Sequence, residues 1–493
     1  MTSIFHPAQI LRTHARVPFA LLVALVLVAS PYFSFSFVGG GYHDGQRFGE
    51  AVCLTLASVI AAWRLLAAPA TVAWTSRSAL VALVIFFSLG AVSSSVAYSP
   101  RLAFHEVATF LLLLILALLV ASEVRAASQR YLNAVFCVCG IGCLFYLYHL
   151  AINFVAFVLN DVQPRHNDII HGFDNFRFMN HMQTVSLPIL CLLLIRSERY
   201  GKQFWLWFGT ATMWWSIVFL TSARGTFVGI AGGLLIALIL RRRFALRWCA
   251  LFLATSTAGL VAYVVFFRYL PTAIGFEPLD FLSSTVGRTA ADPTSRRLEL
   301  WSLAWDTILQ HPLLGMGPVH FAHYAVHLKN AAHPHNWVLQ IASEWGAPAL
   351  LALLVAVASG CRGLWRASRN LLPKDRLNQD LACAWLTIGG AILIDGLVSG
   401  LIVMPVSQLW IAFYIGCALG WVRSRQRSTP LLGNEELRGG IARMLAVLIL
   451  LAATVLFWNG LYPEVADFAR YHEEVTRAFP GMFRPRIWLT GLF

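Results

Sequence analysis

The chain has few charged residues, and among them acidic residues are fewer than basic residues. Only 12% of its 493 residues are Asp, Glu, Lys or Arg, whereas 58% are hydrophobic. So few charges cannot cover the surface of a soluble globular protein of this length. The composition therefore excludes a soluble domain and indicates an all-α polytopic membrane protein.

Motifs of metal-dependent chemistry are also missing. The sequence has no D-x-D pair of carboxylates and no H-E-x-x-H pattern, and its nine cysteines all fall within or at the ends of apolar runs. His323 and His327 have the i, i+4 spacing of zinc ligands, but few acidic residues lie near them, and we interpret them as solvated histidines. We expect neither a disulfide framework, a bound metal nor a cofactor.

We count about thirteen hydrophobic runs of the roughly 20 residues that a helix needs to cross a bilayer. They lie near 17–38, 49–67, 78–98, 106–122, 131–159, 181–195, 204–220, 226–240, 248–267, 337–360, 381–402, 406–422 and 444–459. Lys and Arg concentrate in the short loops of one side, among them Arg241, Arg242, Arg243 and Arg247. The positive-inside rule makes that side cytoplasmic, with the N-terminus inside and the tail outside.

We divide the chain into three parts. Residues 1–203 are N-terminal transmembrane helices, residues 204–424 are a catalytic core, and residues 425–493 hold the last transmembrane helix and an external tail. The core contains the polar loop 268–335. This loop is long enough to hold a site of its own, and it lies on the outer side in the predicted topology.

The second half of this loop predicts an amphipathic helix. Asp292 as N-cap and Pro293 at the first position start it, and it runs to about Gln310. The residues that share one face are Arg297, Trp301, Ala304, Trp305 and Ile308. Such a helix suits the membrane interface. Arg297 then either snorkels to the headgroup layer or belongs to a site.

His335 and Asn336 stand where the loop meets the tenth hydrophobic run. Along that run Asn336, Gln340, Ser343 and Glu344 fall on one helical face for two turns. Polar groups at this depth face protein or a wet cavity, because lipid cannot satisfy their hydrogen bonds. This polar face therefore either lines a site or bonds to neighbouring helices.

Further polar groups lie on the same predicted side. Arg224 stands in a very short link, and glycines recur at every fourth position from Gly225 to Gly233, a spacing that allows close helix packing and a rigid mount. Arg177 and His181 open the sixth run and extend a positive pocket in this interpretation. Asp395, near the outer end of the eleventh run, either lines the same pocket or is a partnered structural group.

These residues resemble a known family, the O-antigen ligase and polymerase superfamily of bacterial membrane glycosyltransferases, which are GT-C-like. The likeness covers roughly 208–420 and includes three elements in order: the Arg-Gly pair of 223–225, the R-x-x-x-W and H-P-x-x-G-x-G pattern of 297–317, and the H-N-x9-G pattern of 335–346. The sequence departs from the family at Ala223, where Ser is usual, and at Ala349.

The resemblance is closest to O-antigen ligase, an enzyme of lipopolysaccharide biosynthesis. It implies transfer of a glycan from undecaprenyl diphosphate to a lipid A-core hydroxyl on the periplasmic face of the bacterial inner membrane. We assign Arg224 and Arg297 to the diphosphate and His335 to the acceptor hydroxyl, without a metal and with inversion at the anomeric carbon. The residues expected to bind substrate are Asn336, Arg177, His181, Gln340, Trp301 and Asp395.

Other functions remain open at this point. An O-antigen polymerase and a protein O-oligosaccharyltransferase share the donor and differ in the acceptor, which is a growing glycan or a protein. A lipid-linked glycan flippase or transporter has a similar composition, but paired repeats and midplane charges are not evident in this sequence. The basic residues are scattered over many loops, so we expect contact with membrane lipids and none with nucleic acid.

Overall fold

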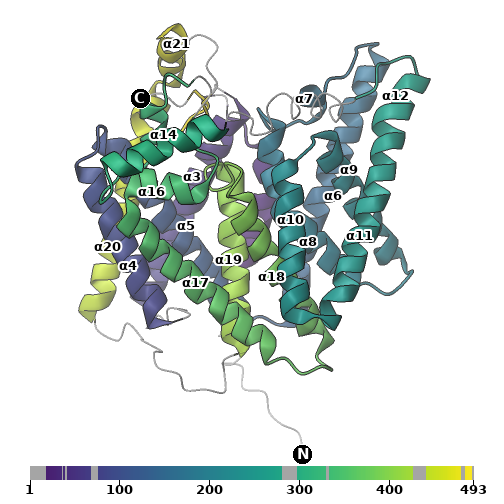
Figure 1. Ribbon diagram of the computed structural model, residues 1–493, viewed down its shortest axis with the longest axis horizontal. Helices are drawn as coiled ribbons and strands as arrows, with labels where there is room; N and C mark the ends of the chain where they lie inside the picture. Colours follow the sequence, from purple (N-terminus) through teal and green to yellow (C-terminus); the bar gives the residue numbers. More distant parts are fainter. Residues whose placement is uncertain are drawn as a thin grey trace, which may run out of the picture.

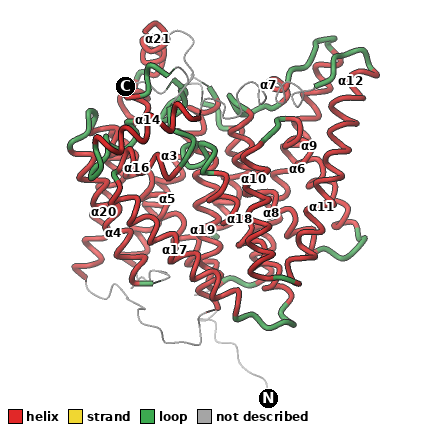
Figure 2. Tube along the Cα trace, viewed as in Figure 1, coloured by secondary structure: helices red, strands yellow, loops and turns green. Residues whose placement is uncertain are grey.

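The computed structural model describes residues 18–35, 37–38, 41–67, 76–279, 297–328, 332–425, 440–478 and 484–490. Regular structure in these ranges is helical, apart from one isolated β-bridge between Phe35 and Val38 (Figure 2). The prediction of an all-α protein is therefore confirmed. A helix satisfies its own backbone hydrogen bonds, which lipid cannot do for it.

Eleven helices in the described ranges are long and apolar enough to cross a membrane. They are α3 (Tyr42–Ala67), α4 (Arg77–Ser95), α5 (Pro100–Ala126), α6 (Gln129–Leu159), α8 (Phe176–Arg196), α10 (Arg224–Arg241), the continuous Arg243–Ala273, α17 (Ala347–Arg369), α18 (Arg376–Asp395), α19 (Pro405–Arg425) and α20 (Gly440–Ala466). The segment Arg243–Ala273 comprises α11 (Arg243–Tyr263), η2 (Val264–Tyr269) and α12 (Leu270–Ala273).

The other two of the thirteen predicted runs are also helical. Run 17–38 forms the shorter α2 (Phe19–Ala29) followed by η1 (Ser30–Tyr32), and run 204–220 forms α9 (Lys202–Leu220), which packs against α8 and α11. The remaining short helices are α7 (His166–Ile169), α14 (Arg297–Gln310), α15 (Phe321–Tyr324), α16 (Trp337–Trp345) and α21 (Phe468–Ala478). Helix α21 lies in the region predicted as the external tail.

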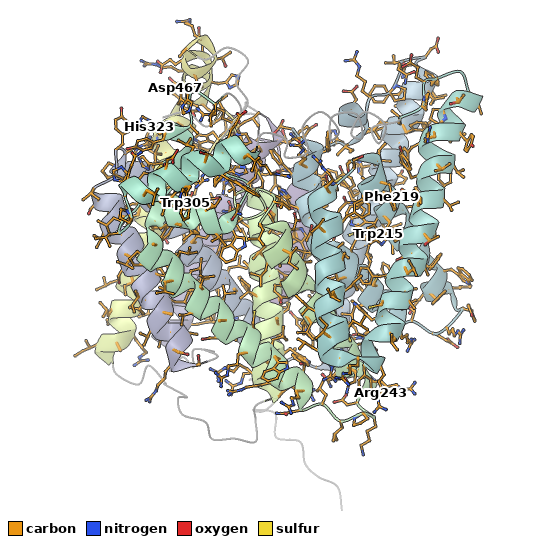
Figure 3. The ribbon with its side chains drawn as sticks, viewed as in Figure 1. Trp215, Phe219, Arg243, Trp305, His323 and Asp467 are labelled. Carbon is orange, nitrogen blue, oxygen red and sulfur yellow. The ribbon has the colours of Figure 1, made fainter. Side chains whose placement is uncertain are left out.

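The helices stand side by side, and the polar elements gather at one end of the bundle. Figure 1 shows α14, α16 and α21 at the upper end of the view. In Figure 3 Trp305 and His323 lie toward that end, while Arg243 lies at the opposite one. We call the first the site end and the second the basic end. The arginines that the sequence assigned to the cytoplasmic side, represented by Arg243, are thus far from the long loop.

Helix α10 packs closely on α18 because its contact face is made of glycine. A Cβ atom added at Gly229 would lie 2.9 Å from the Ala391 carbonyl oxygen, and one at Gly233 would collide with the carbonyl oxygen of Thr387. Both obstacles are backbone atoms of α18, which cannot rotate away. The close helix packing expected from the glycine spacing is therefore present, and it holds the start of α10 firmly against α18.

Replacing Gly233 with alanine is expected to lower the free energy of unfolding by about 1–3 kcal/mol, because the new methyl group forces the two helices apart. Gly209→Ala is the matched control, since a Cβ at this position of α9 meets nothing within 4 Å. Thermal unfolding of the purified variants in the same detergent measures the difference. Equal midpoints for the two variants would contradict the packing argument.

The tenth hydrophobic run is not one continuous span. It breaks at Gly346, whose φ of +91° ends α16 and redirects the chain into α17. A Cβ at Gly346 would collide with the Leu313 carbonyl oxygen, so the loop before α16 passes directly under this corner. The prediction of a single helix over 337–360 is therefore wrong at this point, and α16 is a separate short helix at the site end.

Helix α14 ends at Gln310, as predicted, whereas its predicted start at Asp292 and Pro293 lies outside the described residues. Its buried face differs from the expected one: Leu300, Ala304 and Thr307 are buried and Trp305 is 56% exposed. The helix packs against α16 with Met316 and Phe321 beside it. Contact with protein therefore involves a face centred on Leu300, Ala304 and Thr307, while Trp305 of the predicted face stays exposed.

Candidate active site

Arg224 is mounted on a tight turn. Ser222 adopts a φ of +48°, the Ala223 N–H bonds back to Val218 O at 3.1 Å, and the Arg224 N–H bonds to Ser222 O at 2.8 Å. Arg224 is the first residue of α10, so the turn and the helix together fix the position of its backbone. Its guanidinium group thus leaves the helix N-terminus, where the exposed N–H groups already favour an anion.

A buried polar network lies directly beneath this turn and joins three helices. Thr184 of α8 donates to the Asp395 Oδ2 of α18 at 2.6 Å, and its hydroxyl lies 3.0 Å from that of Thr226 on α10. Asn180 donates from Nδ2 to the Thr221 hydroxyl at 2.9 Å. The Asp395 carboxylate stands where a Cβ at Gly225 would be. The network fixes the starts of α8 and α10 relative to each other.

Asp395 is only 1% exposed, its Oδ2 accepts from Thr184, and its charge acts on Arg297. Its Oδ1 has no hydrogen-bond partner among the described residues. Of the two interpretations of Asp395, a residue that lines the acceptor pocket or a partnered structural group, the bond from Thr184 supports the second. Its negative charge offsets part of the positive charge gathered above it.

Three guanidinium groups converge at the site end. They come from Arg177 near the start of α8, Arg224 at the start of α10 and Arg297, the first described residue of α14. Burial lowers the pKa of Arg297, and the neighbouring charges of Arg224 and Arg177 lower it further. Mutual repulsion of this kind is relieved when an anion binds between the groups. The cluster is thus suited to a ligand that carries more than one negative charge.

His335 lies within electrostatic reach of this cluster. Its φ of +52° is unusual for a residue with a side chain, and its N–H donates to His333 Nδ1 at 3.3 Å. Trp301 of α14 donates from its indole Nε1 to Pro334 O at 3.0 Å, which ties the loop to the helix that carries Arg297. The imidazole is thereby held in one place.

The surroundings keep His335 uncharged. Close-packed protein around the half-buried ring, and then the charges of Arg297 and Arg177, lower its pKa to about 3. His181 adds to the same effect; it is 6% exposed, and its Nδ1 has no hydrogen-bond partner among the described residues. At neutral pH the His335 ring is therefore neutral and has a lone pair free to accept a proton.

Two predicted substrate-binding residues have structural partners instead of facing the cluster. Asn336 is the N-cap of α16, and its Oδ1 accepts from the N–H groups of Val338 at 3.0 Å and Leu339 at 3.1 Å. Gln340 is 1% exposed, and its amide oxygen accepts from Arg486 at 2.9 Å in the orientation that satisfies both groups. Asn336 thus caps its own helix, and Gln340 bonds to a distant segment of the chain, as the second interpretation of this polar face expects.

The structure thus brings together six of the nine predicted site residues: His335, Arg224, Arg297, Arg177, His181 and Asp395. Trp301 supports this group from α14. Among the described residues, no three His, Cys, Asp or Glu side chains are grouped so that they could hold a metal ion. The site carries more positive than negative charge, which favours an anionic ligand.

Two features were missed in the sequence. The polar stretch from Asn180 to Thr184 interrupts an otherwise apolar run, and this signal could have indicated the network under Arg224. Arg486, which reaches Gln340 and Glu344 from the far end of the chain, had no local signal at all. Its pairing depends on contacts between residues more than a hundred positions apart.

Part of the chain is similar to a known protein family. Residues 208–354 match the family model described as O-antigen ligase. The matched segment contains Arg224, Arg297 and His335 and lies inside the predicted core of 204–424. None of the curated proteins matches the chain.

Proposed function

The chain carries an O-antigen ligase family domain at residues 208–354, and on this premise we propose that it moves a glycan from undecaprenyl diphosphate to the hydroxyl of a lipid A-core acceptor. The family implies a glycosyltransferase with a lipid-linked glycan donor and a glycan acceptor. The observation that carries the finer assignment is the convergence of three arginines on one neutral histidine.

The donor's diphosphate fits the arginine cluster. A diphosphate leaving group carries two or more negative charges, and guanidinium groups bind phosphate oxygens with two parallel hydrogen bonds. One such contact at about 4 Å contributes up to roughly 4 kcal/mol at an effective dielectric near 20, before desolvation. Arg224 and Arg297 bind the diphosphate in this proposal, and the more exposed Arg177 extends the pocket toward the same group.

The transfer step then needs a base for the acceptor. The acceptor hydroxyl oxygen forms a bond to the anomeric carbon while the bond from that carbon to the diphosphate oxygen breaks. The diphosphate leaves with the electron pair, and the hydroxyl proton passes to the neutral imidazole of His335. Direct attack from the side opposite the leaving group inverts the anomeric configuration, and the step requires no metal.

The proposed location is the periplasmic face of the inner membrane. The site end carries α14, α16 and the cluster, while Arg243 lies at the basic end (Figure 3). Arginine-rich short loops accumulate on the cytoplasmic side, and this rule supports a periplasmic location for the site end. An undecaprenyl chain in the outer leaflet can then present its diphosphate to Arg224 from the bilayer.

The identity of the acceptor can be tested by determining which molecule carries the transferred glycan. Mass spectrometry of glycan-bearing molecules from cells with and without the gene should show the glycan on lipid A-core only when the gene is present. A product on a growing glycan or on a protein would instead assign a polymerase or a protein O-oligosaccharyltransferase. Reconstituted protein that moves the lipid-linked glycan across a bilayer with its covalent structure unchanged would replace the transferase with a flippase.

A further inference from the structure

Residues 484–490 lie buried against the helices that support the site. Arg484 and Arg486 are 0% and 2% exposed, and Ile487 and Trp488 are also buried. The Trp488 ring meets Phe468 of α21 edge to face, with 5.1 Å between their centroids. A short polar segment that buries two arginines needs specific partners, because an unpaired buried charge is strongly destabilising.

Arg486 finds these partners on two helices. Its Nη2 lies 2.6 Å from Glu344 Oε2 of α16 and 2.7 Å from Glu106 Oε1 of α5. The Gln340 amide oxygen accepts from both Nη1 and Nη2 at 2.9 Å. The planar guanidinium fork thus contacts three acceptors at once, a pattern that a lysine ammonium group cannot reproduce.

Helix α3 holds the backbone of the same segment. Arg47 donates from Nη2 to Arg486 O at 2.9 Å and is itself paired with Glu50 at 2.5 Å. The Leu489 N–H donates to Asp44 Oδ1 at 2.6 Å. The backbone of Arg486 is therefore held by α3, while its side chain contacts α16.

The partners of Arg486 also hold the loop on both sides of His335. Glu344 uses its second oxygen, Oε1, to accept from the Phe321 N–H at 3.1 Å, and its backbone oxygen accepts from Gly317 N at 2.9 Å. The Gln340 N–H bonds to Asn336 O at 2.9 Å, one residue after His335. A movement of α16 would therefore be transmitted directly to the imidazole.

We propose that Arg486 is a positioning residue for His335, acting through Gln340 and Glu344 of α16. The inference rests on the proposed role of His335 in transfer. It assigns a function to a segment outside the matched residues 208–354. In this proposal α3 and α5 set the position of the catalytic loop through Arg486, whose guanidinium group contacts α16.

The test compares three variants of the full-length protein: Arg486→Lys, Arg486→Ala and, as the matched control, Arg470→Ala. Arg470 forms an exposed ion pair with Glu474 on α21 and is 74% exposed, so its loss removes one charge without touching α16. Hydrogen exchange of the peptides covering 312–345 reports the position of the loop, and turnover per folded molecule reports the reaction.

Arg486→Lys keeps the charge and is expected to fold, but exchange in 312–345 should become at least tenfold faster. Its kcat should fall about tenfold, with a smaller change in the donor KM, and Arg470→Ala should match the wild type in both measurements. Arg486→Ala should show a larger effect of the same kind or fail to fold. Unchanged exchange over 312–345 in Arg486→Lys, or a wild-type kcat per folded molecule, would overturn the proposal. The exchange result holds even if the protein proves not to be a transferase, so the two proposals fail separately.

Discussion

Replacing Arg224 or Arg297 with alanine is expected to reduce glycan transfer by about two to three orders of magnitude, at equal amounts of folded protein. Arg224 is the first residue of α10, Arg297 is the first described residue of α14, and each lies within electrostatic reach of the other. The assay uses purified protein with a lipid-linked donor and a lipid A-core acceptor. A loss of this size corresponds to about 2.7–4 kcal/mol of transition-state stabilisation.

The loss should appear mainly in kcat. Negative charge on the diphosphate grows as the anomeric carbon–oxygen bond breaks, so a guanidinium group contacts the transition state more strongly than the bound donor. Lysine at either position keeps a positive charge but loses the two parallel hydrogen bonds, and we expect about a tenfold loss. Alanine and lysine variants therefore separate the contribution of charge from that of geometry.

Arg243→Ala is the control for these variants. Arg243 is exposed at the basic end (Figure 3), and its removal changes the net charge of the protein by the same amount. We expect wild-type transfer from it. Wild-type transfer from Arg224→Ala, or an equal loss from Arg243→Ala, would remove the arginine cluster from the mechanism.

His335→Gln is expected to lower kcat by about 10²- to 10⁴-fold, the range typical of a lost general base. Glutamine preserves much of the size and polarity of the ring but cannot take a proton at neutral pH. The loop that carries residue 335 should remain in place, because Trp301 still donates to Pro334 O and Asn336 still caps α16. Circular dichroism and elution volume check that the variant is folded.

The pH dependence of the wild-type protein should differ between its two kinetic parameters. In the free protein, burial and the charges of Arg297 and Arg177 lower the pKa of His335 to about 3. The profile of kcat/KM, which reports the free enzyme, should therefore show no loss from His335 until the pH falls toward that value. A bound diphosphate cancels the arginine charges and should raise the pKa of His335 above this value, while the larger effect of burial remains.

The profile of kcat should then lose activity at a higher pH than that of kcat/KM. As the pH falls through this raised pKa, His335 becomes protonated in the donor complex and can no longer accept the hydroxyl proton. The donor KM should fall by the same factor, because the protonated ring pairs with the diphosphate. His335→Gln should abolish the difference between the two profiles. Coincident acid limbs in the wild type would show that donor binding does not tune this histidine.

The lowered pKa of His335 also makes the stability of the folded protein depend on pH. Folding favours neutral His335, so its contribution to stability is complete above pH 6.5 and declines as the pH falls toward 3. His320 adds in the same direction, because burial lowers its pKa to about 4. Measurements of the pH profile should therefore be corrected for the fraction of folded protein below about pH 5.

The sequence by itself determined the membrane class and the helical architecture, and it indicated most of the residues that we propose to take part in the reaction. Long apolar runs admit few structures other than helices, because lipid leaves backbone groups without partners. The sequence also predicted the close packing of the helix that contains Gly225 and Gly233. It further indicated the candidate site residues Arg224, Arg297 and His335. A guanidinium group can bind an anion and an imidazole can accept a proton, and both properties follow from the residue type alone.

Tertiary structure alone decided which polar groups face the site and which support it. Gln340 and Glu344 share a helical face with Asn336, yet Arg486 occupies both of them from a segment about 140 residues away in sequence. Asp395 lies under Arg224 because α18 packs against a glycine face of α10. Neither pairing has a local pattern, since hydrogen bonds and ion pairs depend on distance in space, and helix packing brings these residues together only after the chain has folded.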